Sequence, residues 1–594
     1  MKHWILFLSL LLVLVACEGT DSDTESIIEE GTAELEAVIN DAGNTLAGGA
    51  SAELVFINGN IYTVNPEQPW VDAVAIRDGM IVAVGSEEEA FAGVSESAEV
   101  IDLDGTMLMP GFQDMHLHAI EAGMNETVCD FEGFLEPEKY VEEVAYCAEE
   151  EQPDSEWVRG AGVNMANLLS ALGGSRFPIE LLDEAVPDRP VLILDDVGHG
   201  AWANTLAMQA VGYDKLSQNP PGGVVDRDAE TGHLTGVVLE NAQQKLRTAS
   251  LAPTPANLEL GYEGLLRALN ILGENGITTV SDAGGYWTRG HHQIWARAVA
   301  EDTLTVRASN ALYLFPDLPI DQQLADFKKH YTNDKHSLLR FNQAKIYVDG
   351  IISQGTGLMI EPYTNLFGLP GVPDDGFAYF EIDLLNRYAQ ELDAAGFQLH
   401  FHVTGEGGAR QALDVIESTI ASNRNNDQRH RLTHLYSVHP DDRARFAKLN
   451  VIADFQLAPS SVDPAYAQNM EELIGERATD LLPAFDLHEQ GATITISSDW
   501  DADTLSPFVK MQSILSQEAN NVPPLETIIE WMTINPAYLL HQEDTTGTIE
   551  VGKLADLVVL NQNLFEIDPS QLSNTTVLLT FLEGQEVFRH PDAP

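Results

Sequence analysis

The middle of the chain alternates strand-like apolar runs with amphipathic helical patterns. We expect eight strands, at residues 112–118, 277–282, 305–313, 343–348, 397–403, 431–434, 451–456 and 493–498. Helical patterns lie between them, for example at 258–274, 384–395 and 410–422. Strands separated by helices are typical of parallel βα units, and a closed set of them predicts an α/β fold of the (β/α)8 TIM-barrel type.

One connection in this pattern is much longer than the others. It follows the first expected strand and runs over about 119–260, where a short βα loop would be expected. We therefore expect a barrel at residues 111–544 that carries a large insertion after its first strand.

Both ends of the chain show a β pattern instead. Short apolar runs between residues 54 and 84 are separated by Asn58-Gly59 and Asp78-Gly79, which are hairpin signals. The same texture returns at 547–582. Because a closed barrel brings its two ends close together, we expect residues 53–110 and 545–594 to fold as one small β-sandwich domain.

The N-terminus has the features of an export signal. Lys2 precedes an apolar run at 4–15, and the run ends in Leu14-Val15-Ala16-Cys17. A bilayer-spanning helix needs about 20 apolar residues, so a transmembrane anchor is the weaker alternative. This stretch resembles the lipobox of bacterial lipoproteins, which implies a signal peptide at 1–16 and lipidation of Cys17.

The residues after Cys17 indicate where an anchored protein would go. Glu18 follows the cysteine, and by the same resemblance this residue permits transport to the outer membrane, facing the periplasm. Residues 17–52 are rich in Glu, Asp, Thr, Gly and Ala and cannot bury a core. We expect this segment to be an acidic, flexible tether.

The overall charge limits the partners. The chain has 92 acidic and 31 basic residues, a formal net charge of -61. Such an excess argues against binding to nucleic acid or to an anionic lipid surface. We therefore expect membrane contact only through the lipid anchor, and a solvated acidic surface.

Two cysteines other than Cys17 are present, Cys129 and Cys147. An exported location permits a disulfide between them. Neither belongs to a Cys-x-x-Cys zinc motif, and two buried thiols are the alternative that the sequence leaves open.

Six ligand-type residues fall at the ends of expected strands. His116 and His118 alternate on the first strand, so both imidazoles point to the same face and can bind one metal, with Asp114 placed to fix one ring tautomer. The others end strands four, five, six and eight: Lys345, His402, His434 and Asp499. Barrel enzymes gather their catalytic residues at the C-terminal ends of strands. Each residue alone has another explanation, and His400 and His430 show that further histidines lie nearby. Their joint placement predicts a metal site.

These motifs resemble the amidohydrolase superfamily, specifically its family 3 or YtcJ-like branch, from about residue 53 to 588. The matching stretches are Pro110-Gly-Phe-Gln-Asp-Met-His-Leu-His118, Gly198-His-Gly-Ala-Trp-Ala-Asn204, Lys345-Ile-Tyr-Val-Asp-Gly350, His400-Phe-His-Val-Thr-Gly405, Thr433-His434, Ser498-Asp499 and Gly547 through Asp556. Two positions depart from the family pattern, Glu406 and Thr433, and both lie beside ligands.

The resemblance implies two divalent metal ions, with zinc the expected element. His116, His118 and Asp499 would bind one ion, and His402 and His434 the other; His402 is preferred to His400 because of its place in the family motif. Lys345 would bridge the two as a carbamate, that is, as a carboxylated lysine. Charge also favours the carbamate, because a lysine ammonium would be repelled by two dications. A mononuclear site with unmodified Lys345 is the alternative.

The implied reaction is hydrolysis of a carbon–nitrogen bond other than a peptide bond, of the amide, N-acyl or formamide type, by a metal-activated hydroxide. Asp499 would be the base as well as a ligand. A deaminase or esterase on the same barrel is the alternative, and a non-catalytic binding protein is a third class that would be expected to lack ligands.

The insertion supplies the other site candidates. His199 is expected as a catalytic or substrate-contacting residue. Further candidates for substrate contact, for which packing or capping is an equal alternative, are Trp202, Asn204, Glu240 and Asp349. The expected partner is a small amide-like molecule, and the sequence leaves a homodimer open.

Overall fold

The computed structural model describes residues 53–594 except 132, 134–135, 366–371, 501 and 519–520. The expected signal peptide, the lipidation site Cys17 and the tether therefore lie outside the described residues. Within the described part, no helix has both the length and the apolar character that crossing a membrane requires.

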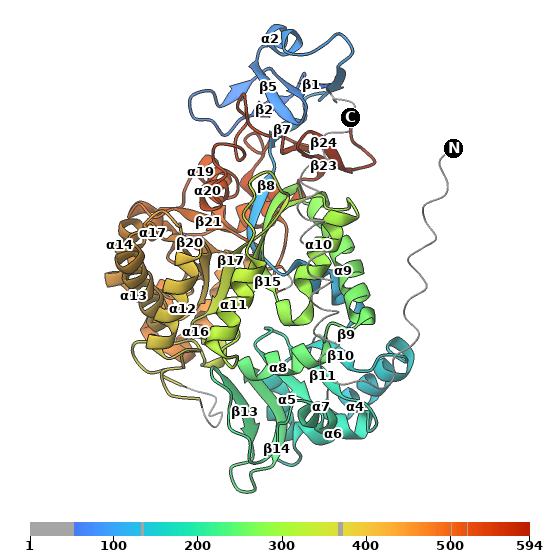
Figure 1. Cartoon of the computed structure of the whole chain (residues 1–594), viewed down its shortest axis with the longest axis vertical. Coiled ribbons are helices and arrows are strands. Elements are labelled where there is room, and N and C mark those ends of the chain that lie inside the picture. Colours follow the sequence, from blue (N-terminus) through green and yellow to red (C-terminus); the bar gives the residue numbers. More distant parts are fainter. Residues whose placement is uncertain (1–52, 132, 134–135, 366–371, 501, 519–520) are drawn as a thin grey trace.

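A barrel of eight parallel strands forms the centre of the molecule (Figure 1). All the strands expected from the sequence are present, although several begin or end a few residues away. They are β8 (Phe112–Leu117), β15 (Ile277–Gly285), β16 (Arg307–Tyr313), β17 (Leu339–Tyr347), β18 (Gln398–Val403), β19 (Arg431–His434), β20 (Ile452–Phe455) and β21 (Ile494–Ile496).

The barrel closes where its last strand meets its first. Leu117 and Trp500 form a parallel bridge. Two backbone hydrogen bonds reinforce it, from Asp499 N to the His116 carbonyl and from His118 N to the Trp500 carbonyl, both 2.7 Å. The closure therefore runs through the residues that carry the expected metal ligands.

Helices cover the outside of the barrel (Figure 1). The three quoted from the sequence correspond to α9 (Pro255–Glu274), α12 (Ile382–Ala394) and α13 (Glu406–Asn423), and each begins a few residues earlier than expected. In α9 the reason is a cap: the Thr254 side chain accepts a hydrogen bond from Asn257 N, and Pro255 occupies the first turn. Because such first turns are polar, apolar periodicity alone places the start of the helix a few residues too late.

The inside of the barrel is lined with buried polar side chains. Gln343 accepts from Ser281 Oγ at 2.7 Å and from Arg431 Nη2 at 2.8 Å, and its amide donates to Gln398 Oε1 at 3.0 Å. Apolar neighbours such as Ala344 point outward into the core shared with the helices. Strand alternation thus places ligand-type residues inside and the hydrophobic core outside.

The two ends of the chain come together in two sheets. One sheet has the order β5-β4-β1-β6, and the other, β24-β23-β22-β7-β2-β3, joins strands from both ends. In these sheets β1 is Glu53–Ile57, β2 Asn60–Tyr62, β3 Trp70–Val71, β4 Ala73–Arg77, β5 Met80–Gly85, β6 Glu99–Asp102, β7 Met107–Pro110, β22 Leu557–Leu560, β23 Val577–Leu582 and β24 Gln585–Arg589. A shared cluster that includes Phe56, Ile76, Val559 and Phe581 fills the space between them.

The two hairpin signals have different outcomes. Asp78-Gly79 does join an antiparallel pair, β4 and β5. Asn58-Gly59 does not, because β1 and β2 lie in different sheets. Asn58 has φ of +57°, and a side chain on Gly59 would collide with Leu103. The Asn-Gly turn therefore moves the chain from one sheet to the other, a choice that the dipeptide alone does not encode.

The segment between β8 and β15 forms its own six-stranded sheet, in the order β13-β14-β12-β11-β10-β9. Its strands are β9 (Cys129–Asp130), β10 (Val158–Val163), β11 (Val191–Asp195), β12 (Gly200–Ala203), β13 (Gly223–Arg227) and β14 (Leu234–Glu240). Figure 1 places this unit at the end of the molecule opposite the two terminal sheets.

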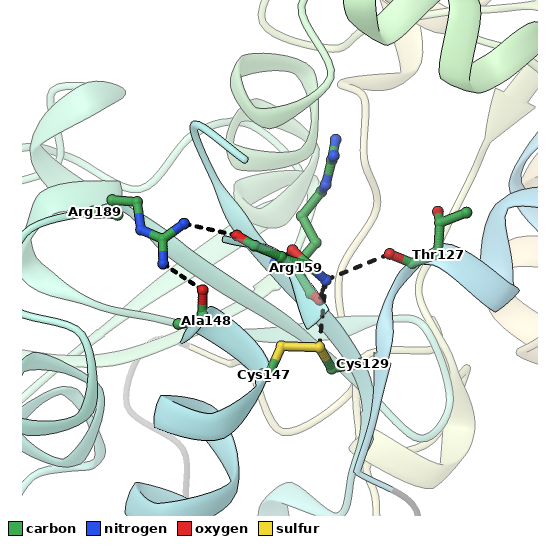
Figure 2. The surroundings of a disulfide bond; sticks show 7 residues. Thr127, Cys129, Cys147, Ala148, Arg159 and Arg189 are labelled. Carbon is green, nitrogen blue, oxygen red and sulfur yellow. Dashed lines mark hydrogen bonds between the residues drawn. A yellow bond between two sulfur atoms is a disulfide. The ribbon is translucent and has the colours of Figure 1, made fainter. Parts of the chain in front are cut away.

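A disulfide ties the edge of this inserted sheet to a helix. Cys129 on β9 is bonded to Cys147, which directly follows α4 (Pro137–Tyr146) (Figure 2). Gln152 Nε2 donates to the Arg159 carbonyl at 2.7 Å, and Arg189 Nη2 donates to the Ala148 carbonyl at 2.7 Å. The bridge and these side chains fix the turn after α4. Of the two alternatives that the sequence leaves open, the structure has the disulfide and not two free thiols.

Candidate metal centre at the barrel mouth

His116 and His118 meet Asp499 where the barrel closes. His116 Nε2 lies 3.3 Å from Asp499 Oδ1, and His118 Nε2 lies 3.5 Å from the same oxygen. Both histidines are buried, and together with Asp499 they form a group whose ligand atoms can hold one metal ion. His116 lies in β8 and His118 directly follows it, two residues on, so both imidazoles reach the same point, as the sequence predicts.

Lys345 reaches the same point from β17. Its Nζ lies 3.0 Å from His116 Nε2, and the side chain is fully buried. Burial lowers the pKa of the Lys345 ammonium to about 7. A lysine that is neutral near neutral pH is the form that can react with CO₂.

His402 and His434 lie beside this group, with ring centroids 4.5 Å apart. His402 Nε2 donates to the Gly350 carbonyl at 3.3 Å, which leaves Nδ1 as the basic nitrogen, and this atom is buried without a hydrogen-bond partner among the described residues. The amide oxygen of Gln456 lies 3.0 Å from His434 Nδ1 and accepts its proton, which leaves Nε2 as the basic nitrogen. Both rings therefore offer an unprotonated nitrogen, as metal ligands must.

Electrostatics keep the histidines neutral and the carboxylate ionised. Burial holds the pKa of His116 and of His402 well below the usual range, and lowers that of His434 to about 4. Burial alone would raise the pKa of Asp499, but the adjacent His116 holds it well below its usual range. This combination, neutral imidazoles around a carboxylate, is the donor set of a divalent transition-metal site.

Backbone conformation sets two of these residues apart. His434 has φ of +80° and Asp499 has φ of +54°. Residues other than glycine seldom adopt this left-handed region, and such strain is concentrated at functional sites. In both cases the turn directs a side chain from the end of a strand across the mouth of the barrel.

His400, considered a spare histidine from the sequence, lies directly behind a ligand. Its Nε2 is 2.8 Å from His116 Nδ1, and Arg431 Nη2 is 2.8 Å from its Nδ1. The ring thus holds the orientation of His116. The sequence already indicates this placement, because His400 and His402 are two residues apart on one strand and must both point into the barrel.

Asp114 does not have the role expected for it. Its Oδ1 accepts from the backbone of His116 at 3.1 Å and of Ser498 at 3.0 Å. The carboxylate therefore joins the first and last strands and bonds to no imidazole in the described structure.

The insertion sends one side chain to this centre. His199 packs against His402, with ring centroids 5.2 Å apart. Its Nδ1 lies 2.7 Å from Oε2 of the fully buried Glu240, which also accepts from the Tyr379 hydroxyl at 2.7 Å. Burial alone would lower the pKa of His199, but the Glu240 carboxylate raises it above the usual value. Glu240 thus acts on the site through His199.

The other three candidates for substrate contact lie elsewhere, and their expected role is revised. Trp202 is fully buried in the inserted unit, with its ring 5.6 Å from that of Tyr140. Asn204 caps α7 (Thr205–Ala210) through a bond from Ala207 N at 2.9 Å. Asp349 accepts backbone bonds, from Leu358, Thr404 and Gly405. Each satisfies a packing or backbone requirement that local sequence cannot distinguish from ligand binding.

A cleft opens directly over the centre. Its volume is about 950 Å³ including the open mouth, and the ligand-type residues His402, His434 and Asp499 line it together with His199. The other described residues that line it come from loops after several strands and from the inserted unit. They are Asp196, Val197, Ile351, Ile352, Ser353, Thr404, Tyr436, Gln456, Ser460, Ser461, Tyr466, Ala502 and Asp503.

Comparison with known proteins agrees with this geometry. The profile of the amidohydrolase family matches residues 99–588. The chain belongs to the amidohydrolase family, which makes it a hydrolase built on a barrel of this type.

Relatives of similar length share about a quarter of their residues with it. The N-substituted formamide deformylase of Arthrobacter pascens is 26% identical over 550 residues, 90% of this chain and 97% of the relative. A protein named YtcJ from Bacillus subtilis (strain 168) is 26% identical over 549 residues, 90% of this chain and 99% of the relative.

Solved structures share the fold. An uncharacterized metal-dependent hydrolase from Pyrococcus horikoshii OT3 superimposes with a TM-score of 0.67 at 21% identity, covering 90% of this chain and all of that chain. A second, from Pyrococcus furiosus, has a TM-score of 0.65 at 22% identity and covers 87% of this chain. At this identity the likeness concerns the fold alone.

Proposed function

We propose that the protein is a metal-dependent hydrolase of carbon–nitrogen bonds other than peptide bonds, acting on amides of the N-acyl or formamide type. The observation that carries the proposal is the convergence of His116, His118, Lys345 and Asp499 at the point of barrel closure, with His402 and His434 beside them. The N-substituted formamide deformylase among the relatives supports the choice of bond.

The residues fit two divalent ions, for which zinc is the expected element. His116, His118 and Asp499 would hold one ion, and the unpartnered Nδ1 of His402 with Nε2 of His434 the other. Lys345 as a carbamate would supply an oxygen to each. A divalent ion bound here lowers the pKa of a water from about 15.7 to about 7 and polarises a carbonyl.

The protein's own groups would then move one proton. Hydrolysis adds the hydroxyl of water to the acyl carbon and a proton to the departing nitrogen. Asp499, with its low pKa, is ionised and faces the centre, so it can accept that proton and deliver it to the nitrogen. His199, held by Glu240, is placed on the cleft wall to contact the substrate.

The test is a screen of formamides, N-acyl amines, N-acyl D- and L-amino acids and cyclic amides, with and without a chelator. Chelator-sensitive release of an amine is the expected result. Counting metal ions per chain separates this proposal from a deaminase, which on this barrel is expected to use one ion and no carboxylated lysine. Turnover of esters or nucleobases alone, with one ion per chain, would contradict the proposal.

The contribution of His199 can be tested through its partner. Glu240→Gln keeps the shape of the side chain but removes the charge that orients the imidazole. We expect a loss of about 10–100-fold in activity, with the metal content unchanged. If the Glu240→Gln and the His199→Ala variants were both as active as the parent, a role for this pair in the reaction would be excluded.

We further propose that the protein is exported and anchored in a bacterial membrane, the outer membrane facing the periplasm, through a lipid on Cys17. Support comes from the lipobox at Leu14-Val15-Ala16-Cys17. Cys17→Ser, or a block of lipoprotein processing, should release or mislocalise the protein. Membrane association that survives Cys17→Ser would contradict this anchor.

A further inference from the structure

The side chains that line the cleft carry more negative than positive charge: the His199 imidazole is paired with the buried Glu240 carboxylate, whereas two aspartates on the walls have no such partner. Asp196 and Asp503 lie on its walls, in addition to the catalytic candidate Asp499. Asp503 accepts from Ser460 Oγ at 3.1 Å and Asp196 from Asn164 Nδ2 at 2.7 Å. Among the described residues neither carboxylate has an ion-pair partner, so both contribute negative charge to the cleft.

No lysine or arginine opposes them, and the one lining imidazole with a raised pKa, His199, is already paired with Glu240 at 2.7 Å. The described residues include every lysine and arginine of the chain except Lys2, and none of these lines the cleft. Lys510 interacts electrostatically with Asp503, but it is buried beneath the cleft surface and donates to the Gln456 carbonyl at 3.1 Å. Arg477 donates to the Glu361 and Pro362 carbonyls. Lys345 is buried below the cleft and would be anionic as a carbamate.

One wall is apolar and aromatic. Tyr436 and Tyr466 stand with ring centroids 5.7 Å apart, and Ile351 and Ile352 lie on the same cleft. Ile352 belongs to a hydrophobic cluster with Met470 and Leu473, and the two tyrosines pack against the same cluster. Such a surface binds a hydrocarbon or aromatic group through contact area and ring stacking.

A site that recognises a carboxylate usually offers a cationic side chain, most often an arginine that pairs with both oxygens. Here a carboxylate on the substrate would meet Asp196 and Asp503 in a protein of net charge -61. Like-charge juxtaposition of this kind costs binding and slows association.

We propose that the cleft selects amides of apolar or aromatic amines that carry no carboxylate, and discriminates against N-acyl amino acids. This inference rests on the proposed function, because it names the substrate class of the same site. It identifies Asp196 and Asp503 as residues that exclude anionic substrates and Tyr436 with Tyr466 as the surface for the amine substituent.

The test uses three compounds that differ at one position: N-formyl-2-phenylethylamine, N-formylphenylalanine and N-formylphenylalanine amide, the latter two as both enantiomers, with the N-acetyl series in parallel. The first and third compounds should be hydrolysed, and the carboxylate should lower kcat/KM by about tenfold or more, mainly through KM. Hydrolysis of the carboxylate compound at an equal or higher rate would overturn the inference.

A double variant tests the cause. Asp196→Asn with Asp503→Asn removes two negative charges, and it should narrow the ratio of kcat/KM between the neutral and carboxylate compounds several-fold. Glu87→Gln with Glu88→Gln is the matched control, because it removes the same charge from exposed positions on the distant α2 (Glu87–Ala92). An unchanged ratio in the cleft variant, or an equal change in the control, would overturn the assignment.

Binding measurements without turnover test the charge selection separately from the proposed reaction. Calorimetry on the metal-loaded protein should detect 2-phenylethylamine and not phenylalanine. Hydrolysis of none of the compounds would contradict the proposed function, whereas preferred binding of phenylalanine would contradict the charge selection itself.

Discussion

Asp499 contacts His116 through both its backbone and its side chain. Its backbone N–H donates to the His116 carbonyl at 2.7 Å, and its Oδ1 lies 3.3 Å from His116 Nε2. The last strand of the barrel is therefore joined to the first by the same residues that form the candidate metal centre. The contacts that close the barrel therefore also bring the ligand-type residues together, so the site depends on the closed fold.

Removing one imidazole should abolish turnover while the barrel survives. In His116→Ala the backbone bond to Asp499 remains, and only the side chain is lost. We expect activity to fall by more than about 100-fold, with a far-UV spectrum like that of the parent. His434→Ala should behave in the same way. Near-normal activity in both purified variants would exclude the two-ion site.

Lys345→Ala should lose activity and regain part of it with a short carboxylic acid. The acid can occupy the space of the carbamate and offer oxygens to both ions. Assays with and without added formate or propionate, together with metal content and electron density at the parent lysine nitrogen, provide the check. One ion per chain, unmodified lysine and an active alanine variant would together defeat the proposal.

Metal removal should lower stability as well as activity. An ion that binds the folded chain and not the unfolded one stabilises it by about 3 kcal/mol at one hundred times its Kd. Dialysis against a chelator should lower the Tm, and added zinc should restore both Tm and turnover. An unchanged Tm and full activity after verified metal removal would contradict the site.

Loss of the Cys129–Cys147 bond should destabilise the inserted unit. The two cysteines are 18 residues apart, and a closed loop of this size contributes about 3 kcal/mol. Urea unfolding of the Cys129→Ala/Cys147→Ala variant should show the loss, and a reducing agent should affect the parent but not the variant. Equal sensitivity of both proteins to the reductant would show that the effect does not come from this bond.

Asp195 should make stability depend on pH. Burial raises its pKa from 3.8 to about 7, and its Oδ1 has no hydrogen-bond partner among the described residues. The folded state thus holds a proton that the unfolded chain releases. The stabilising contribution is fully present below pH 3.8 and is lost as the pH rises through about 7.

The isosteric variant Asp195→Asn removes this titration. Its unfolding free energy should match that of the parent at low pH and exceed it above pH 7, by a difference on the order of a few kcal/mol. Urea unfolding at pH 5 and pH 8 measures the difference. A constant offset between the two proteins at both pH values would show that Asp195 does not titrate in this range.

The sequence by itself determined the barrel and the set of ligand-type residues. Both are local consequences of pattern: strands and helices alternate along the chain, and residues at strand ends must gather at one end of a parallel barrel. His116, His118, Lys345 and Asp499 could be found in this way because their position depends only on strand alternation and strand order.

The tertiary structure alone decided how individual side chains are used. His400 supports His116 across a separation of 284 residues, whereas Trp202 and Asn204 complete the inserted unit. Asn58-Gly59 connects two sheets because Leu103 closes over it. These roles depend on contacts between distant segments, and a residue type that suits packing, capping or ligand binding equally well acquires its role only from the neighbours that the fold brings to it.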